Sequence, residues 1–396
     1  MNKSLSFLLG AGFSAPMGYP VGKDLNKSLL KCTGENFSFN TDGLLCFSTD
    51  GKKPDFGFIP DYEFEFDFCR DLMLYFNDTK GYFDYEEFYD FFIYKAKEDP
   101  KVEKLFISKN YGSHKHLTDM LFSIKNIFNQ LVINFLVDKE GNSWYDNAAY
   151  MGVPSFSGYT GILNCFHNFG KDYLVNVHTL NHDLFFERLN YTFGLQGELC
   201  DGFEELGSPY YGDLSVDKRS YKCRLEYYTG NYDKKYRLFK LHGSKDYGIY
   251  YASNGSTLMP ENYIKTRRGI SINKLFKEIE DSNKKLFYER CWINYHADFL
   301  TGTSSKIERY QEPLLFNILF DNFKKNLNES EKLIIIGYGG KDTEINKMLL
   351  SHFDFKNKPT FIIDPFAGDE IKNLNFKLGG SLIEKEIEDI EIEDLL

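Results

Sequence analysis

The sequence predicts an α/β fold, a Rossmann-like doubly wound parallel sheet with a large helical insertion. Residues 5–9 form an apolar run that leads through a glycine turn toward a helix expected at 23–31. Residues 333–336 form the clearest of several later apolar runs, which are typical of buried parallel strands. A glycine or polar residue follows one run after another, at Gly10, Asn181, His242, Thr301, Gly337 and Asp364. In a doubly wound sheet such positions share one edge, where ligands bind.

The chain divides into an α/β part and an inserted part. Residues 1–32 and 155–380 carry the α/β pattern, with further strands expected at 173–177, 238–241, 299–300 and 361–363. Residues 33–154 are expected to form a mostly helical insertion, since residues 117–137 have apolar side chains at helical spacing. Within this insertion, aromatic residues alternate with acids over 62–68, which suits a strand or an extended segment.

Two further segments complete the expected organisation. Residues 197–235 are polar and predict loops or a β excursion, and residues 245–295 form a second insertion. The acidic residues 381–396 have isoleucines at helical spacing, which predicts a solvated C-terminal helix resting on the domain. A contact with a partner or with a second copy is the alternative for this tail.

Composition narrows the class of protein. With 396 residues, 42% hydrophobic and 27% charged, the chain is globular and holds one large domain or two ordinary ones. A net charge of −11 excludes a global nucleic-acid footprint, although a local basic patch stays open. The seven cysteines form no C-x-x-C pair, which indicates reduced intracellular thiols. No apolar run is long enough to span a membrane or to act as a signal peptide, so we expect a cytoplasmic protein.

The glycine turn between the first strand and helix is the most informative segment. Glycines let the backbone approach a pyrophosphate, and unpaired amides at a helix start face the anion. A tight turn without any ligand fits the same residues. A dehydrogenase would need an acid about 20 residues further on. Glu35 lies near that distance, but it does not follow an apolar strand, which argues against that class.

Three segments, in this order, resemble the sirtuin family: Gly10-Ala11-Gly12-Phe13-Ser14, Thr179-Leu180-Asn181-His182-Asp183 and Leu241-His242-Gly243-Ser244. In sirtuins the first segment holds the NAD phosphates, the second supplies an Asn and an Asp near the nicotinamide ribose, and the third supplies the catalytic His. The resemblance covers roughly residues 1–30 and 160–370 and leaves out the helical insertion. It implies an NAD-binding domain with Asn181, His242 and Asp183 as catalytic residues.

The chain departs from the protein deacylases of this family. They carry two C-x-x-C pairs after the His segment, whereas residues 245–295 contain only Cys291, so we expect neither a zinc ribbon nor any other metal site. The chain is similar instead to the bacterial defence branch, in its segments 337–342 and 363–365. Members of that branch destroy cellular NAD when phage infection is sensed. The resemblance implies a member of the branch that is not fused to a sensor domain. Such a member is a homo-oligomer that works with a HerA-type ATPase.

The chemistry assigns roles to the matching residues. The nicotinamide–ribose bond breaks through an oxocarbenium-like state, so the site must hold the ribose and stabilise developing charge. Asn181 is expected to orient a water and contact the ribose, with a turn or cap residue as the alternative. His242 is expected to accept a proton. Asp183 is expected to brace the loop or to contact the nicotinamide side, with a cap of the following helix as the alternative. His178 is expected in the core or directly behind the site residues.

The remaining expected contacts are with the dinucleotide. The phosphates should meet the amides of residues 11–13 and the Ser14 hydroxyl, and residues 301–304 should touch the ribose or phosphate. Asp24 is expected near the nicotinamide ribose, with a plain helix-start acid as the alternative. Asp342 has the same alternative. The expected NAD-binding residues are Gly10, Ala11, Gly12, Phe13, Ser14, Asp24, Thr301, Gly302, Thr303, Ser304, Gly337, Tyr338, Asp342 and, for the adenosine ribose, Asp364.

The main prediction is an NAD+ glycohydrolase of abortive anti-phage defence, with NAD+ as its substrate and no zinc. One alternative is a sensor module that binds NAD or ADP-ribose without turnover, and another is a protein deacylase. Partner-dependent nuclease activity stays open, although no acidic metal cluster has a convincing spacing. The pair His114 and His116 suits a solvated loop better than a metal site, because no acid or Cys partner lies at ligand spacing.

Overall fold

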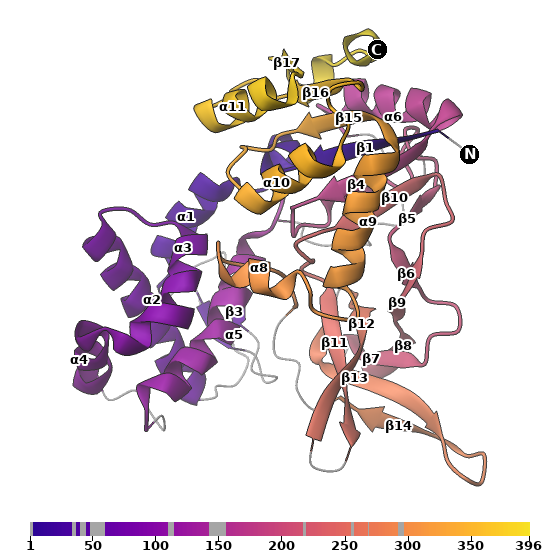
Figure 1. The fold of residues 1–396 in the computed structure, drawn as a ribbon. Coiled ribbons are helices and arrows are strands. Elements are labelled where there is room, and N and C mark those ends of the chain that lie inside the picture. The colour runs from indigo at the N-terminus through magenta and orange to yellow at the C-terminus, as the bar shows by residue number, and fades with distance from the viewer. Residues whose placement is uncertain are drawn as a thin grey trace.

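The computed structural model describes residues 3–33, 37–39, 45–47, 60–109, 115–141, 156–216, 219–254, 257–267, 269–291 and 297–396. A seven-stranded sheet of order β17-β16-β15-β1-β4-β10-β5 forms its centre (Figure 1). All six strand pairings are parallel, which confirms the predicted α/β class. The strands are β1 (Ser4–Leu9), β4 (Leu174–Thr179), β5 (Leu199–Cys200), β10 (Tyr236–Lys240), β15 (Ser330–Ile336), β16 (Thr360–Ile363) and β17 (Ser381–Ile383).

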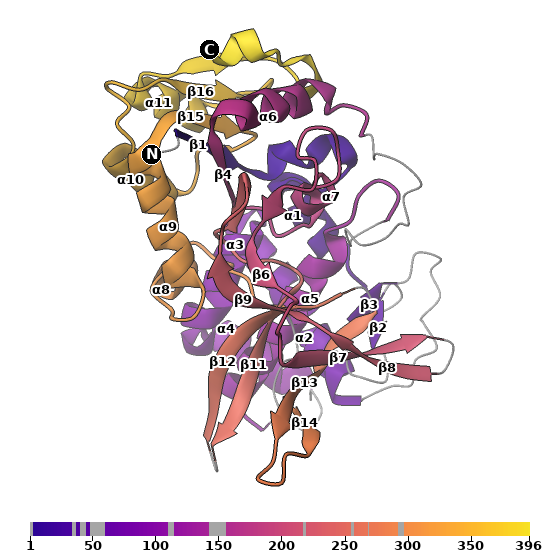
Figure 2. The ribbon, with the colours of Figure 1, turned by 90° about the vertical axis from the view of Figure 1, so that its right-hand side faces the viewer.

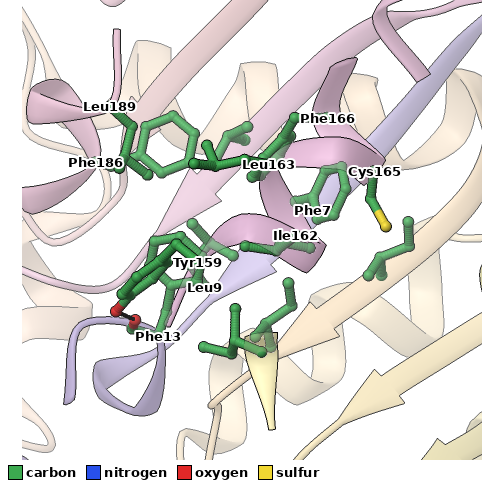
Figure 3. Packing of buried hydrophobic residues seen from close by; sticks show 14 of the residues in the cluster. Phe7, Leu9, Phe13, Tyr159, Ile162, Leu163, Cys165, Phe166, Phe186 and Leu189 are labelled. Carbon is green, nitrogen blue, oxygen red and sulfur yellow. Dashed lines mark hydrogen bonds between the residues drawn. The ribbon is translucent and has the colours of Figure 1, made fainter. Parts of the chain in front are cut away.

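Helices cover both faces of this sheet, as a doubly wound fold requires. On one face, Phe7 and Leu9 of β1 pack toward α6 (Thr160–Asp172), with the Phe7 and Phe166 ring centroids 4.7 Å apart (Figure 3). On the other face, Leu8 packs in a second core with α9 (Phe316–Glu329), α10 (Thr343–His352) and α11 (Asp369–Leu378). Burial on both faces explains why β1 is a continuous apolar run.

The helical insertion packs around a core of its own. The helix α1 (Gly22–Leu30), expected at 23–31, packs with α2 (Pro60–Lys80), α3 (Tyr85–Asp90), α4 (Pro100–Lys109) and α5 (Leu117–Phe135). A hairpin of β2 (Phe37–Phe39) and β3 (Leu45–Phe47) joins this core. Among the described residues, no helix has the length and apolar composition needed to span a bilayer.

The extended segment expected at 62–68 is wrong, because these residues belong to α2. Phe68, Leu72 and Phe76 are spaced by four, and all three are buried in the core of the insertion. This helical period continues as far as Phe76, whereas the alternation of aromatics and acids ends at residue 68. The longer period therefore decides the structure. Glu35 and His114 lie outside the described residues, and His116 is the exposed N-cap residue of α5.

Two antiparallel four-stranded sheets lie beside the parallel sheet (Figure 2). One has the order β11-β12-β9-β6 and the other β14-β13-β7-β8. Their strands come from both segments in which loops, a β excursion or a second insertion were expected. They are β6 (Gly202–Glu204), β7 (Tyr210–Val216), β8 (Arg219–Arg224), β9 (Glu226–Asn231), β11 (Tyr247–Asn254), β12 (Thr257–Lys265), β13 (Ile270–Glu280) and β14 (Leu286–Arg290).

The C-terminal tail is not the solvated helix that was expected at 381–396. It begins with β17, the edge strand of the parallel sheet, and continues through two short 3-10 turns, Ile387–Asp389 and Ile392–Leu395. Ile387 and Ile390 are at most 5% exposed and belong to the α6 core. A Cβ atom at Gly161 of α6 would lie 2.3 Å from the Glu388 carbonyl oxygen, so this glycine lets the tail close onto the helix. The isoleucine spacing thus reflects burial of the tail rather than a helical face.

Candidate active site

The ends of four adjacent strands, β15, β1, β4 and β10, form one edge of the parallel sheet. Backbone hydrogen bonds continue past the strands here, from Gly10 N to Ile336 O at 3.0 Å and from Leu241 N to Thr179 O at 2.9 Å. This confirms that the glycine turn and the loops holding Asn181 and His242 lie at one edge. The expected strand at 299–300 is wrong: Phe299 makes one antiparallel bridge to Gly243 and lies beside the His242 loop.

The glycine turn lies directly against the loop that follows β15. A Cβ atom at Gly10 would lie 2.6 Å from the Gly337 carbonyl oxygen, and one at Gly12 would lie 2.7 Å from the Gly337 Cα atom. Gly337 itself has φ of +60°, a left-handed conformation that favours glycine. The glycines of both loops are therefore required for the backbones to touch.

Two of the three backbone amides expected to face phosphates, those of Gly12 and Phe13, are already paired within the protein. Gly12 N donates to Gly337 O at 3.0 Å, Phe13 N donates to Gly10 O at 2.9 Å, and Ser14 N donates to Ala11 O at 3.2 Å. The reason is local: residues Ala11–Phe13 form a 3-10 turn, and α1 begins only at Gly22. Phosphate binding through the amides of Gly12 and Phe13 would thus require this turn to rearrange.

Asn181 is held at the glycine turn by its side-chain amide. Asn181 Nδ2 donates to Gly10 O at 3.0 Å and to the buried Ser14 Oγ at 3.1 Å. The Asp183 carboxylate accepts from Phe185 N at 2.9 Å. Burial raises the pKa of Asp183, while Lys240, the Phe185 amide and the Ser14 hydroxyl act against it. Asp183 therefore braces the loop and holds the start of α7 (Phe185–Arg188) together.

His242 lies buried opposite a carboxylate. Its side chain is 6% exposed, and Nε2 lies 3.6 Å from Asp342 Oδ2. Burial, followed by the charge of Lys306, holds the pKa of His242 well below its usual value, so the imidazole is neutral at neutral pH. Burial opposes ionisation of Asp342, but the positive charge of Lys306 and the hydrogen bonds that the carboxylate accepts outweigh it and lower the pKa of that carboxyl. The site thus pairs a neutral imidazole with a carboxylate.

Asp342 has two functions at once. Its Oδ1 accepts from the amides of Glu344 and Ile345, both at 3.1 Å, and so caps α10. Its Oδ2 faces His242 and lies 2.8 Å from Lys306 Nζ. The helix-cap alternative is therefore correct for one oxygen, while the other belongs to the site.

The helical insertion contributes to this site through a buried lysine. Lys306 on α8 (Ser305–Arg309) is 6% exposed, and its Nζ lies 3.3 Å from Glu86 Oε1 on α3. Figure 1 shows α8 facing the insertion helices. The charged side chains of Glu86, Lys306 and Asp342 thus connect the insertion to His242. Sequence reasoning missed Lys306, although it follows the marked segment 301–304, and it had no signal for Glu86.

The loop at residues 301–304 is tied to the insertion by Asp90. The Asp90 carboxylate accepts from Ser304 N, from Thr303 Oγ1 and from Ser305 Oγ, each at 2.6 Å. Thr301 is buried beside this loop, and Gly302 has φ of +94°. Thr303 and Ser304 thus hold the insertion in place, and their expected contact with the ribose or phosphate stays a prediction.

Two other histidines near these strands are buried. His178 on β4 lies between the rings of Phe239 and Phe323, at centroid distances of 4.9 and 4.7 Å, and burial lowers its pKa to about 3. This confirms its expected place in the core. The ring of His182 lies 6.3 Å from that of His242, and its pKa is also lowered to about 3, mainly by burial. Among the described residues, no group of three or more His, Cys, Asp or Glu side chains is arranged to hold a metal ion.

Three further expected residues make contacts within the protein, and their contacts with NAD stay predictions. The Tyr338 hydroxyl accepts from Asp342 N at 3.1 Å and so braces the loop after β15. Asp364 follows β16 and accepts from Phe366 N at 2.9 Å, two strands away from β1. Asp24 lies in the first turn of α1, 60% exposed, with its carboxylate 3.6 Å from Lys27 Nζ. The contacts of Asp24 are those of the helix-start alternative.

No protein-family model matches the chain, and a search among curated proteins found no match. Many solved structures resemble the chain, and three of them are Sir2 structures. One is a Sir2 homologue in complex with NAD, at a TM-score of 0.35 and 10% identity, covering 100% of this chain and 88% of that chain. Another is a mutant of Sir2 homologues with 2′-O-acetyl-ADP-ribose, at 0.37 and 12%, covering 100% and 91%. A structure on the mechanism and regulation of Sir2 enzymes gives 0.33 and 11%, covering 99% and 91%. With TM-scores this low, function has to be inferred from the contacts of the site itself.

Proposed function

We propose that this protein is an NAD+ glycohydrolase, which converts NAD+ and water into nicotinamide and ADP-ribose. The observation that carries the proposal is the arrangement at one sheet edge. Asn181 is fixed against the glycine turn through Ser14, and the loop that follows β10 presents the neutral His242 opposite Asp342. His182 O accepts from Lys245 N at 3.0 Å, so the loops that carry Asn181 and His242 are neighbours.

The proposed reaction needs no acid for its leaving group, because nicotinamide departs as a neutral molecule from a cationic pyridinium. The C1′–N bond breaks, a water oxygen bonds to C1′, and one proton is released from that water. Asn181 donates to Gly10 O and Ser14 Oγ, which orients its Oδ1 to accept a hydrogen bond from the ribose or from the water. His242 takes the proton, and the Asp342 carboxylate stabilises the imidazolium that results.

We further propose that this activity serves anti-phage abortive defence, in a homo-oligomer that works with a HerA-type ATPase. This part rests on the resemblance of the segments 337–342 and 363–365 to the bacterial defence branch. The burial of the site supports control by assembly: the side chains of His242, Asp342 and Lys306 are 6–9% exposed. Side chains this deeply buried leave no space for a dinucleotide, so the loops around them must open before NAD+ enters.

The test is nicotinamide release from NAD+ by the purified protein, measured by chromatography with and without the co-encoded ATPase. We expect release with wild type and at least a hundredfold loss in Asn181→Ala and His242→Ala. His352→Ala and Asn357→Ala, which change the same residue types outside the site, should retain wild-type rates. Full turnover in the first two variants would contradict the assigned roles. Saturable binding of intact NAD would instead indicate a sensor module, and release that depends on an acetylated peptide would indicate a deacylase.

A further inference from the structure

A cavity lies on the far side of β10 from the glycine turn, between the edge strand β5 and the antiparallel strands β6 and β9. Its volume is about 400 Å³. Six carboxylates line it, against the two ammonium groups of Lys234 and Lys265. The six acids are Glu187, Asp201, Glu204, Glu205, Glu226 and Asp233.

Some of these acids are neutralised within the protein. Lys265 is paired with Asp201, and Arg267 is paired with Glu205. Glu226 and Asp233, in contrast, form no ion pair with a cation of the described part of the chain. Burial raises the pKa of Glu226, with Lys265 acting against it. The cavity therefore keeps an excess of negative charge after its internal pairs are formed.

Glu187 supplies the deepest carboxylate. The residue is only 6% exposed, and its Oε1 lies 3.0 Å from Lys240 Nζ. Its Oε2 is buried, and no donor among the described residues hydrogen-bonds it. A buried carboxylate oxygen without a donor is costly, and an N–H group arriving from the cavity would remove that cost.

The outer wall of the cavity is apolar and open. Tyr191 is 69% exposed and Leu206 is 90% exposed, and both line the cavity. An aromatic ring and an aliphatic side chain suit the methylene stem of a long basic side chain, while carboxylates further in suit its charged end. A divalent ion fits less well, because no group of three or more His, Cys, Asp or Glu in the described residues is arranged as metal ligands.

We propose that this cavity binds a guanidinium or ammonium group at the end of an aliphatic stem, with Glu187 Oε2, Glu226 and Asp233 as its acceptors. A lysine or arginine side chain of a partner protein and a free polyamine share this chemistry. The site is linked to the predicted catalytic loop, because Lys240 Nζ contacts both Glu187 and the carbonyl oxygen of Asp183. The occupant on Oε2 therefore shares Glu187 with Lys240 on Oε1, and through Lys240 the effect reaches the loop that carries Asn181. The binding itself does not depend on the proposed NAD+ cleavage.

The test is calorimetric titration of the full chain at 150 mM NaCl, about physiological ionic strength. The probes are an acetylated and amidated Gly-Arg-Gly peptide, spermidine and MgCl2. We expect saturable binding of one organic cation per chain. Each of Glu226→Gln and Asp233→Asn should weaken it about tenfold. Glu187→Gln should weaken it as well, but its contact with Lys240 makes the other two variants the safer test of the cavity.

The matched control removes acids elsewhere on the surface, with Glu384→Gln and Glu388→Gln in the exposed part of the tail. Binding that these variants leave unchanged supports the cavity, and preference for the peptide or for spermidine then assigns the source of the cation. Equal weakening by the control variants would show only general attraction to an acidic protein and would overturn the proposal. So would an affinity that Glu226→Gln and Asp233→Asn leave unchanged, or displacement of both organic cations by magnesium.

Discussion

Replacing Lys306 by methionine should raise the pKa of His242, which Lys306 now lowers through its positive charge. Asp342 Oδ2 lies 2.8 Å from Lys306 Nζ and 3.6 Å from His242 Nε2, so the two nitrogens are no more than about 6.4 Å apart. At an effective dielectric constant of about 20, two like charges at that distance repel by about 2.6 kcal/mol. Removing one of them should raise the pKa of His242 by about two or more.

The assay is a pH titration of the histidine ring nitrogens by NMR. The chain has eight histidines, and the signal that disappears in His242→Asn identifies the one of interest. In wild type we expect His242 to stay neutral far into the acid range, since burial, Lys306 and His182 all lower its pKa and only Asp342 opposes them. In an active assembly, the acid limb of kcat/KM should move to higher pH in Lys306→Met.

Lys306→Arg is the matched control, because it keeps the positive charge beside Asp342. It should leave the titration of His242 close to wild type. Lys306→Met also leaves Glu86 and Asp342 without their shared cation, so thermal unfolding must show that the variant is folded at the temperature of the titration. A folded Lys306→Met whose His242 titrates as in wild type, or at lower pH, would refute the electrostatic coupling.

Three further predictions concern the loops. Gly337→Ala should cost about 2 kcal/mol or more of unfolding free energy in denaturant titrations, because its Cβ would lie 2.4 Å from Phe13 N at a positive φ; Gly339→Ala meets no atom within 4 Å and should be nearly neutral. Ser14→Ala should reduce nicotinamide release at least tenfold in a chain that remains folded, because Asn181 loses an acceptor; a wild-type rate would contradict this. Asp90→Asn should make the free energy of unfolding less sensitive to acid. Burial opposes ionisation of Asp90, but its hydrogen bonds to residues 303–305 lower its pKa in the folded state. The carboxylate therefore stabilises the folded protein fully above the unfolded pKa of about 3.9, and this stabilisation is lost as pH falls through the folded pKa. Chemical unfolding as a function of pH should show a shallower acid loss for the variant, and an unchanged profile would contradict the assignment.

The sheet was predictable because its signals are local. The run at residues 333–336 is apolar because β15 is buried on both faces, and residues 10, 181 and 242 follow strands that end at the same edge. The sequence predicted a close backbone approach at the glycines of the first turn, but the structure shows a different partner for that approach. They were expected to admit a phosphate, but Gly10 and Gly12 also admit the backbone of the loop after β15.

The rest depends on contacts between distant residues. Glu86 and Lys306 are 220 positions apart, and no spacing in the sequence relates a helix of the insertion to a loop beside His242. The tail was misread because isoleucines at helical spacing look the same whether the segment is a helix or lies along α6. Segment 62–68 shows the converse error, in which a short alternation hid a helical period that continues as far as Phe76.

The central position of β1 has a consequence for synthesis. β1 is synthesised well before β15, one of its two neighbours: the hydroxyls of Ser6 and Ser330, which hydrogen-bond, are 324 positions apart. At about 5–20 residues per second, the apolar strand waits roughly 15–65 s for that neighbour. Until β15 is made, a nascent chain of this protein therefore exposes one edge of its central strand, and any early stop before β15 releases a product whose central strand lacks one of its partners.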